Sequence, residues 1–293
     1  MSKEYYDISK LGEIEISKDI KSEEKNKYIY NFNVIFPEEI YRLKQYTFCN
    51  TNINKINIPE GVTSIENYCF NSCKLLKEIN LPESLLYIGD DCFSCTNISS
   101  IIIPKSVIHF GERVFSYCNN LENVEFNNIM NEIPNSTFEK SGIKNFILKN
   151  DILKLGNKCF YESKLETIKF NDNLLELSYY CFGSTNLKKI EIPPKIKIIP
   201  IGCFSNCNEL NEINLGNIIC IFNYGFSNCN LNNIIFPKTL LQIKSKSFFN
   251  NKFKELFIPK NIRILGSYCF QKCEDLLLVK IEFSDKKRKF NFY

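Results

Sequence analysis

The sequence predicts an α/β-type repeat solenoid of about eleven coils, each 22–23 residues long, instead of a globular domain with one closed core. Two observations predict it: one phenylalanine recurs along the chain, and several apolar columns line up with it. The spacings between successive members are 22, 23, 22 and 23 residues, then six of 22. The recurring residues are Phe48, Phe70, Phe93, Phe115, Phe138, Phe160, Phe182, Phe204, Phe226, Phe248 and Phe270.

Each coil is expected to contribute one short strand. In the coil that begins at Leu76, the apolar residues Ile79 and Leu81 alternate with period two, as in a strand with one buried face. Pro82 ends the strand, because proline cannot donate a hydrogen bond to a neighbouring strand. Equivalent strands of stacked coils should pair into one parallel sheet at ~4.8 Å per coil. Apolar residues such as Leu85 return to the interior, which leaves short turns or helical turns for the opposite face.

The pattern divides the chain into three parts. Residues 1–30 are expected to form an N-terminal cap, a degenerate coil in which Leu11, Ile14 and Ile16 resemble a strand. Residues 31–283 form the solenoid. Residues 284–293 form a basic C-terminal tail, and its run of four basic residues at 286–289 is either a solvated chain end or a contact for an acidic surface or import receptor.

Charge and hydropathy argue against a nucleic-acid partner and against a transmembrane segment. The chain has 37 basic and 33 acidic residues, a net charge of +4, so we expect no nucleic-acid partner. No apolar run approaches the 18–20 residues of a transmembrane segment, so none is predicted. No signal-peptide pattern follows Met1, which predicts a cytoplasmic location with reduced thiols.

The repeat resembles that of the BspA-like leucine-rich repeat family. The segments INLP at 79–82 and CFSNC at 203–207 carry its two most recognisable features, a proline after the strand and a cysteine–phenylalanine pair before a cysteine. The likeness covers residues 31–283 and implies a leucine-rich-repeat solenoid. That family includes bacterial surface antigens and is expanded in parasitic protozoa, whose composition this chain resembles. The resemblance therefore implies a surface antigen or adhesin that binds host or matrix proteins, with the cell surface as the alternative location.

The 14 cysteines of this cysteine-rich chain fall mainly in two columns. We interpret both as packing columns that accept small side chains. Redox or metal chemistry at Cys92 and Cys95 is an alternative, although the second pair of a zinc site is missing. Disulfides along the column of Cys159, Cys181 and Cys203 are another, in an oxidising compartment. The first column is Cys69, Cys92, Cys159, Cys181, Cys203 and Cys269; the second is Cys73, Cys118, Cys207, Cys229 and Cys273, with Cys95 assigned to it after a one-residue shift.

The sequence offers little for catalysis. His109 is the only histidine and lies in an expected turn, so we expect neither a His-based metal site nor a Ser-His-Asp arrangement. The 11 glycines form no phosphate-binding loop. We therefore expect a non-enzymatic protein with no cofactor and no metal site.

The strand residues that point away from the core are the candidate binding surface. Their central column reads Ile35, Asn57, Asn80, Ile102, Glu125, Ile147, Lys169, Glu191, Asn214, Ile235, Phe257 and Lys280. Apolar residues stand there beside charged ones, as in protein interfaces, although scattered apolar surface residues would look the same. The predicted partner-binding residues are Ile102, Ile147, Lys169, Glu191, Ile235 and Phe257.

Three functions follow in order of preference. The first is a non-catalytic protein–protein interaction scaffold that binds an unidentified protein partner through the exposed sheet face. The second is a cell-surface adhesin, which the family resemblance alone favours. The third is an enzyme with an unrecognised site on a loop, which would need a cluster of carboxylates in a deep pocket.

Overall fold

The computed structural model describes residues 34, 36, 39–282 and 289–290. The chain forms two compact units: the first runs to residue 130 and includes 136–143, and the second comprises 131–135 and the residues from 144 onward. The predicted cap at 1–30 and most of the predicted tail at 284–293 lie outside the described residues. In the described part, the coil repeat of the solenoid is confirmed.

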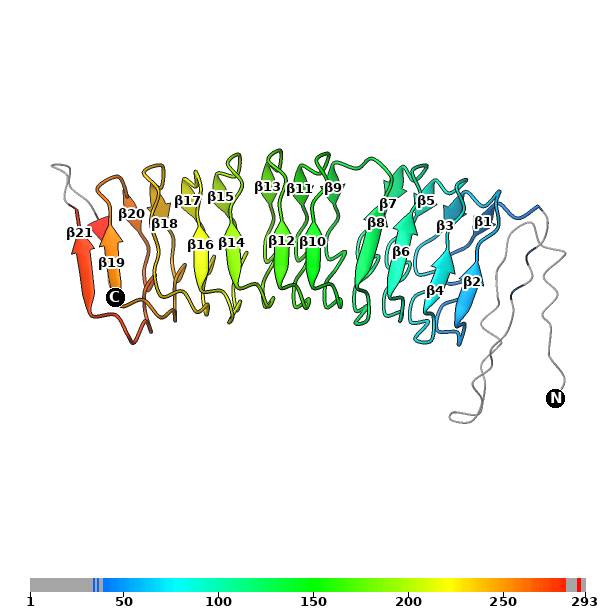
Figure 1. Ribbon diagram of the computed structural model, residues 1–293, viewed down its shortest axis with the longest axis horizontal. Coiled ribbons are helices and arrows are strands. Elements are labelled where there is room, and N and C mark those ends of the chain that lie inside the picture. The colour runs from blue at the N-terminus through cyan, green and yellow to red at the C-terminus, as the bar shows by residue number, and fades with distance from the viewer. Residues whose placement is uncertain (1–33, 35, 37–38, 283–288, 291–293) are drawn as a thin grey trace. The chain divides into compact units, whose positions relative to one another are not determined.

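Strands of three or four residues, the main strands, occupy the positions that the sequence predicts (Figure 1). In the first unit they are β2 (Lys55–Asn57), β4 (Glu78–Asn80), β6 (Ser100–Ile103) and β8 (Asn123–Phe126). In the second unit they are β10 (Asn145–Ile147), β12 (Thr167–Lys169), β14 (Lys189–Glu191), β16 (Glu212–Asn214), β19 (Glu255–Ile258) and β21 (Leu278–Ile281).

Strands of two residues, the corner strands, form a second row five to six residues before each phenylalanine. In the first unit they are β1 (Arg42–Leu43), β3 (Ser64–Ile65), β5 (Tyr87–Ile88) and β7 (His109–Phe110). In the second unit they are β9 (Glu132–Ile133), β11 (Lys154–Leu155), β13 (Glu176–Leu177), β15 (Ile198–Ile199), β17 (Cys220–Ile221), β18 (Gln242–Ile243), β20 (Ile264–Leu265) and β22 (Lys289–Phe290). β22, inside the predicted tail, pairs with β20.

The two rows pair differently, although all pairs are parallel. Corner strands form the ladders β1-β3-β5-β7, β9-β11-β13 and β15-β17-β18-β20-β22. Main strands pair only two by two, as β2-β4, β6-β8, β10-β12, β14-β16 and β19-β21. Corner strands keep a constant distance from the phenylalanine, as Leu43 does from Phe48, so their register is fixed. The link from a phenylalanine to the next main strand varies by one residue: it spans eight from Phe48 to Ile56 and nine from Phe70 to Ile79.

The phenylalanine column forms the centre of both units. In the first unit, Phe48 and Phe70 are fully buried and stack with ring centroids 5.1 Å apart. In the second unit, Phe204 and Phe226 are fully buried and stack at 5.1 Å with an interplanar angle of 3°. Offset aromatic stacking adds to the hydrophobic gain from burial. The predicted core column is therefore confirmed: its rings pack each coil against the next within a unit.

The face opposite the main strands consists of turns and corner strands. Among the residues that the structure describes there is no α-helix, so the helical turns allowed by the sequence do not occur there. Over the same ranges, no helix has the length and apolar character of a membrane span. Ladders of tight turns replace helices because the residues on either side of the phenylalanine turn sharply: Tyr68 and Ser72, two before and two after Phe70, have φ angles of 58° and 60°.

Candidate functional site

Strand alternation points the predicted binding column outward in both units. In β10, Phe146 faces the core with 8% of its surface exposed, and its neighbour Ile147 is 75% exposed. In β19, Leu256 is buried and Phe257 is 54% exposed. The other four predicted residues, Ile102, Lys169, Glu191 and Ile235, are also exposed. The predicted outward orientation of these side chains is therefore confirmed; their role in binding stays a prediction.

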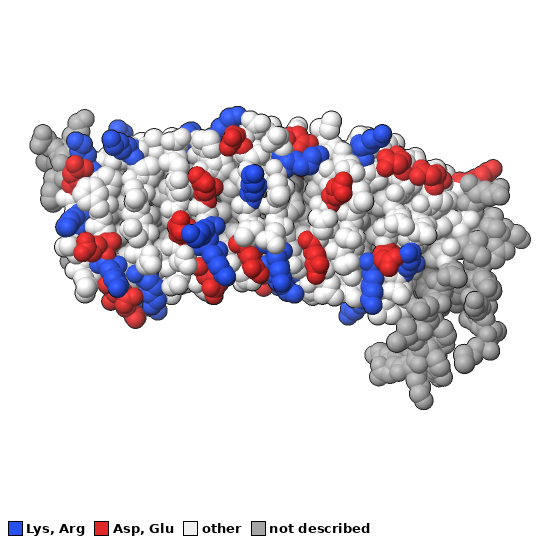
Figure 2. Space-filling model, viewed as in Figure 1, with Lys and Arg blue, Asp and Glu red and all other residues white. Residues whose placement is uncertain are grey.

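The structure brings only some of these side chains together. Ile147 of β10 lies opposite Lys169 of β12, which places an apolar side chain beside a charged one. Glu191 lies opposite a residue outside the predicted set, Asn214 of β16. Ile102 belongs to the first unit and the other five predicted residues to the second. On the face seen in Figure 2, basic and acidic side chains are interspersed in each unit among the described residues.

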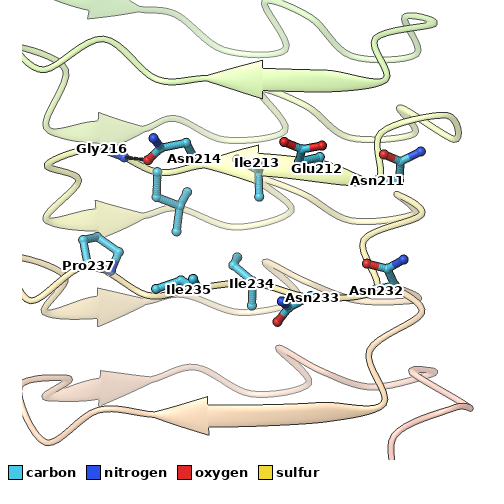
Figure 3. A pocket seen from close by; sticks show the side chains of 11 residues that line it. Asn211, Glu212, Ile213, Asn214, Gly216, Asn232, Asn233, Ile234, Ile235 and Pro237 are labelled. Atoms are coloured by element: carbon cyan, nitrogen blue, oxygen red, sulfur yellow. Dashed lines mark hydrogen bonds between the residues drawn. The ribbon is translucent and has the colours of Figure 1, made fainter.

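Ile235 lies at a predicted strand position where the structure forms no strand. Residues 232–237 run between β16 and β19 without joining either strand. Within the described part of the chain, the main-chain groups of residues 232–236 make no hydrogen bond. A groove of about 600 Å³ lies between β16 and this segment (Figure 3). It is lined by Asn211, Glu212, Ile213, Asn214, Leu215, Gly216, Asn232, Asn233, Ile234, Ile235 and Pro237.

We call this groove, between β16 and residues 232–237, the seam. A shortened turn lies beside it. Two residues separate Leu215 from Ile218, whereas three separate Phe236 from Leu240 at the same place in the next coil. The shorter turn requires Gly216 at φ 54°, and a Cβ there would lie 2.7 Å from the carbonyl oxygen of Ile192. The slip of this repeat is visible in the sequence, but the groove beside it is not.

A second exposed apolar stripe lies on the turn just before the corner strands, and sequence reasoning missed it. Ile108 in the first unit is 84% exposed, and Leu175 in the second is 55% exposed. Each directly follows a buried member of the core, Val107 and Leu174. In the sequence, this exposed surface is marked by two consecutive apolar residues in a turn where the repeat was expected to accept any residue.

The cysteine column three residues after the phenylalanine has a polar role besides packing. The Sγ atoms of Cys73, Cys118 and Cys207 donate to the carbonyl oxygen of the phenylalanine one coil earlier, at 2.9, 3.1 and 3.0 Å. Asn251, in the same column, donates from Nδ2 to the corresponding oxygen of Phe226 at 2.8 Å. The column therefore selects small side chains that can donate a hydrogen bond, since buried polar side chains need a partner.

One cysteine was assigned wrongly from the sequence. Thr96, and not Cys95, occupies the donor column, where its hydroxyl donates to the Phe93 carbonyl oxygen at 2.8 Å. Cys95 lies one residue earlier in a left-handed turn, with φ 58°. Thr185 shows the same arrangement and donates to the Phe182 carbonyl oxygen of its own coil.

The thiols are poorly suited to redox or metal chemistry. All 14 cysteines are free thiols. Desolvation raises the pKa of Cys92 well above its usual value, which disfavours the reactive thiolate. Desolvation also raises the pKa of Cys159, and the neighbouring thiol of Cys181 adds to the effect. Cys181 therefore lies beside Cys159, as the column predicts.

His109 has a structural neighbour. Its ring stacks on Tyr87 of the preceding coil, with centroids 4.3 Å apart and planes 5° from parallel. It lies in β7, not in the turn expected from the sequence. Among the described residues, no group of three or more His, Cys, Asp or Glu side chains is placed to hold a metal ion.

Comparison with known proteins gives one family. The model of the BspA type leucine rich repeat region matches residues 25–144, 131–222 and 216–292, as six copies. Together these ranges include all the main strands and the seam. No curated protein matched the sequence.

Three solved structures with a similar fold come from bacteria. A leucine-rich repeat protein from Bacteroides ovatus is 25% identical with a TM-score of 0.56, covering 83% of this chain and 77% of its own. The pneumococcal vaccine antigen PcpA is 19% identical with a TM-score of 0.60, and the match covers 84% of this chain and 66% of the PcpA chain. A leucine rich cell surface protein from Faecalibacterium prausnitzii is 18% identical with a TM-score of 0.52, covering 87% and 73%.

Proposed function

The chain belongs to the BspA-type leucine-rich repeat family, and on that premise we propose that it is a non-catalytic scaffold that binds a protein partner. The partner is contacted through the outer face of the main strands. The single observation that carries the proposal is the exposure of large apolar side chains on that face: Ile147 is 75% exposed and Ile235 is 82% exposed. Apolar anchors among polar and charged neighbours are the usual composition of protein interfaces.

The charge pattern supports a protein partner over a nucleic acid. Lys189 forms an ion pair with Glu212, and Lys154 lies 3.2 Å from Glu132, so basic side chains of the main and corner strands are matched by acidic ones. A nucleic-acid surface instead gathers basic residues on one face. Aligned Lys and Glu side chains add orientation to an interface more than affinity.

For the setting of this interaction we propose the cell surface, in place of the cytoplasmic location that the sequence predicts. Two of the solved relatives are described as a vaccine antigen and a cell surface protein. Their identities of 19% and 18% carry the fold alone, so the location needs its own test. Labelling of intact source cells with a membrane-impermeant biotin reagent should mark this chain. Labelling no stronger than that of an intracellular control protein would contradict a surface location.

Paired variants test the binding face. The double variant Ile147→Glu with Ile235→Glu charges the outer face, and Ile108→Glu with Leu175→Glu charges the turn stripe as a matched control. Each variant is used to capture cross-linked partners from source-cell and host-cell extracts, and captured proteins are quantified by mass spectrometry. Loss of two interface anchors should weaken capture of a specific partner at least tenfold, about 1.4 kcal/mol or more. The control should keep capture within about twofold.

Two outcomes would refute the face assignment. The first is equal capture by the outer-face variant and the wild-type chain. The second is loss of capture only in the turn-stripe variant. All substituted side chains are exposed, so circular dichroism and melting curves should stay those of the wild type, which separates lost binding from lost folding.

A further inference from the structure

We propose that the seam between β16 and residues 232–237 binds an uncharged, extended polypeptide segment through main-chain hydrogen bonds. This inference deepens the proposed function, since it names the chemistry of the partner at one part of the same face. It begins from the main chain of residues 232–236, whose N–H and C=O groups have no partner within the described part of the protein. An extended segment with unpaired peptide groups is a template for another strand.

The other wall of the seam has the same property. β16 pairs with β14, where the amide of Glu212 donates to Lys188 at 3.3 Å and the carbonyl of Asn214 accepts from Ile192 at 2.9 Å. Alternate residues of a strand direct their peptide groups to opposite edges. The peptide groups of Ile213 therefore face the seam, where no strand is paired with β16.

Among the described residues, three of the four asparagine side chains that line the seam make no hydrogen bond; the fourth, Asn214, accepts one from the amide of Gly216 at 3.0 Å. Elsewhere, polar side chains on paired main strands close the gap between coils: Asn80 donates to Asn57 at 2.6 Å, and Thr167 donates to Asn145 at 2.6 Å. At the seam, Asn211 and Asn232 occupy successive coils, and among the described residues their side chains make no hydrogen bond with each other or with anything else. Asn233 is likewise exposed and lines the groove (Figure 3).

The lining defines the ligand class. Its only charged side chain is that of Glu212, which is already paired with Lys189. It contains no aromatic ring and no basic group, which are the groups that hold bases and phosphates. Amide side chains and peptide groups complement other peptide groups, and the exposed apolar Ile235 can contact side chains of the bound segment. The chemistry therefore fits a neutral extended peptide.

Two tryptophan variants provide the test. Asn233→Trp places a bulky ring in the seam. Asn145→Trp places the same ring at the equivalent position of β10, where the main strands are paired. Both positions are exposed, so both variants should fold. The probe is a displayed library of random ten-residue peptides selected on the full wild-type chain. Enriched peptides are synthesised with and without N-methyl groups on alternate amides, which removes main-chain donors and keeps the side chains.

We expect peptides that bind Asn145→Trp as they bind the wild type and bind Asn233→Trp at least tenfold more weakly. N-methylation should cause a similar loss in one of the two alternate registers. Hydrogen exchange of the amides of Asn233 and Ile235, which face the β16 side by the same alternation, should slow when the peptide is bound. Failure to enrich any peptide, equal binding by Asn233→Trp, or tolerance of N-methylation in both registers would overturn the inference. So would a glycan that binds this seam when no peptide does.

The result can be separated from that of the proposed function. Suppose partner capture requires Ile147 while the selected peptides ignore Asn233→Trp. The proposed face then stands and the seam inference fails. If the peptides depend on Asn233 while partner capture survives charging of the outer face, the seam inference stands and the proposed face fails.

Discussion

Replacing Phe204 by alanine tests whether the phenylalanine column ties the coils together. The side chain is fully buried and stacks on Phe182 at 5.2 Å and on Phe226 at 5.1 Å. Truncation of a buried phenylalanine costs about 3–5 kcal/mol. Each lost aromatic pair contributes about 0.5–1.5 kcal/mol beyond area burial, so the upper part of that range is expected. Phe257→Ala, on the exposed side of β19, is the matched control and should change stability by less than about 0.5 kcal/mol.

Thermal unfolding followed by circular dichroism measures the difference. A loss of 1 kcal/mol lowers Tm by about 2–4 °C in a chain of roughly this size, so Phe204→Ala should lower it by about 6–20 °C. Because long repeat arrays can unfold in parts, the whole melting curve is compared along with its midpoint. A Tm within 2 °C of the wild type, or equal losses in Phe204→Ala and Phe257→Ala, would show that the column is not the core.

Three other changes test the donor column, the shortened turn and the buried thiols. Cys207→Ala should lower the free energy of unfolding by about 0.5–1.5 kcal/mol, because the Phe182 carbonyl loses the thiol donor and keeps the Thr185 hydroxyl, and Cys207→Ser should recover part of it; equal losses in urea titrations would contradict a hydrogen-bonding role. Gly216→Ala should cost more than about 1 kcal/mol because of its positive φ and its contact with Ile192, and an unchanged urea midpoint would disprove that strain. Burial raises the pKa of Cys207 and Cys118 to about 11 from 9.0. The unfolded chain therefore loses these protons first, and stability should fall as pH rises from 9 to 11. Replacing both residues with serine should make that part of the curve less steep, because the other buried thiols still contribute, and an identical slope would refute the assignment.

Much of the fold could be predicted because it depends on spacing alone. The phenylalanine column, the main strands and the outward direction of Ile147 and Phe257 all follow from a 22-residue period combined with alternation along a strand. The function of those outward side chains does not follow, since exposure permits binding without specifying it.

Other features depend on geometry that a repeat pattern does not contain. The corner strands arise from a register fixed by the adjacent phenylalanine, and the two-residue strand around Ile88 has no sequence period of its own. The donor role of the column that contains Cys73 requires knowing that its side chain reaches the carbonyl of the preceding coil, at 2.9 Å. The seam shows in the sequence only as the short turn at Gly216; the groove exists because β16 pairs with β14 and not with residues 232–237.

Hydrogen exchange of the chain with its captured partner tests the central claim most directly. The claim is that the partner lies on the outer face of the main strands. The amides of β10, residues 232–236 and β19 should exchange more slowly in the complex than in the free chain, while the turns that carry Ile108 and Leu175 should be unchanged. Slowing confined to that turn, or none on the main strands, would contradict the account.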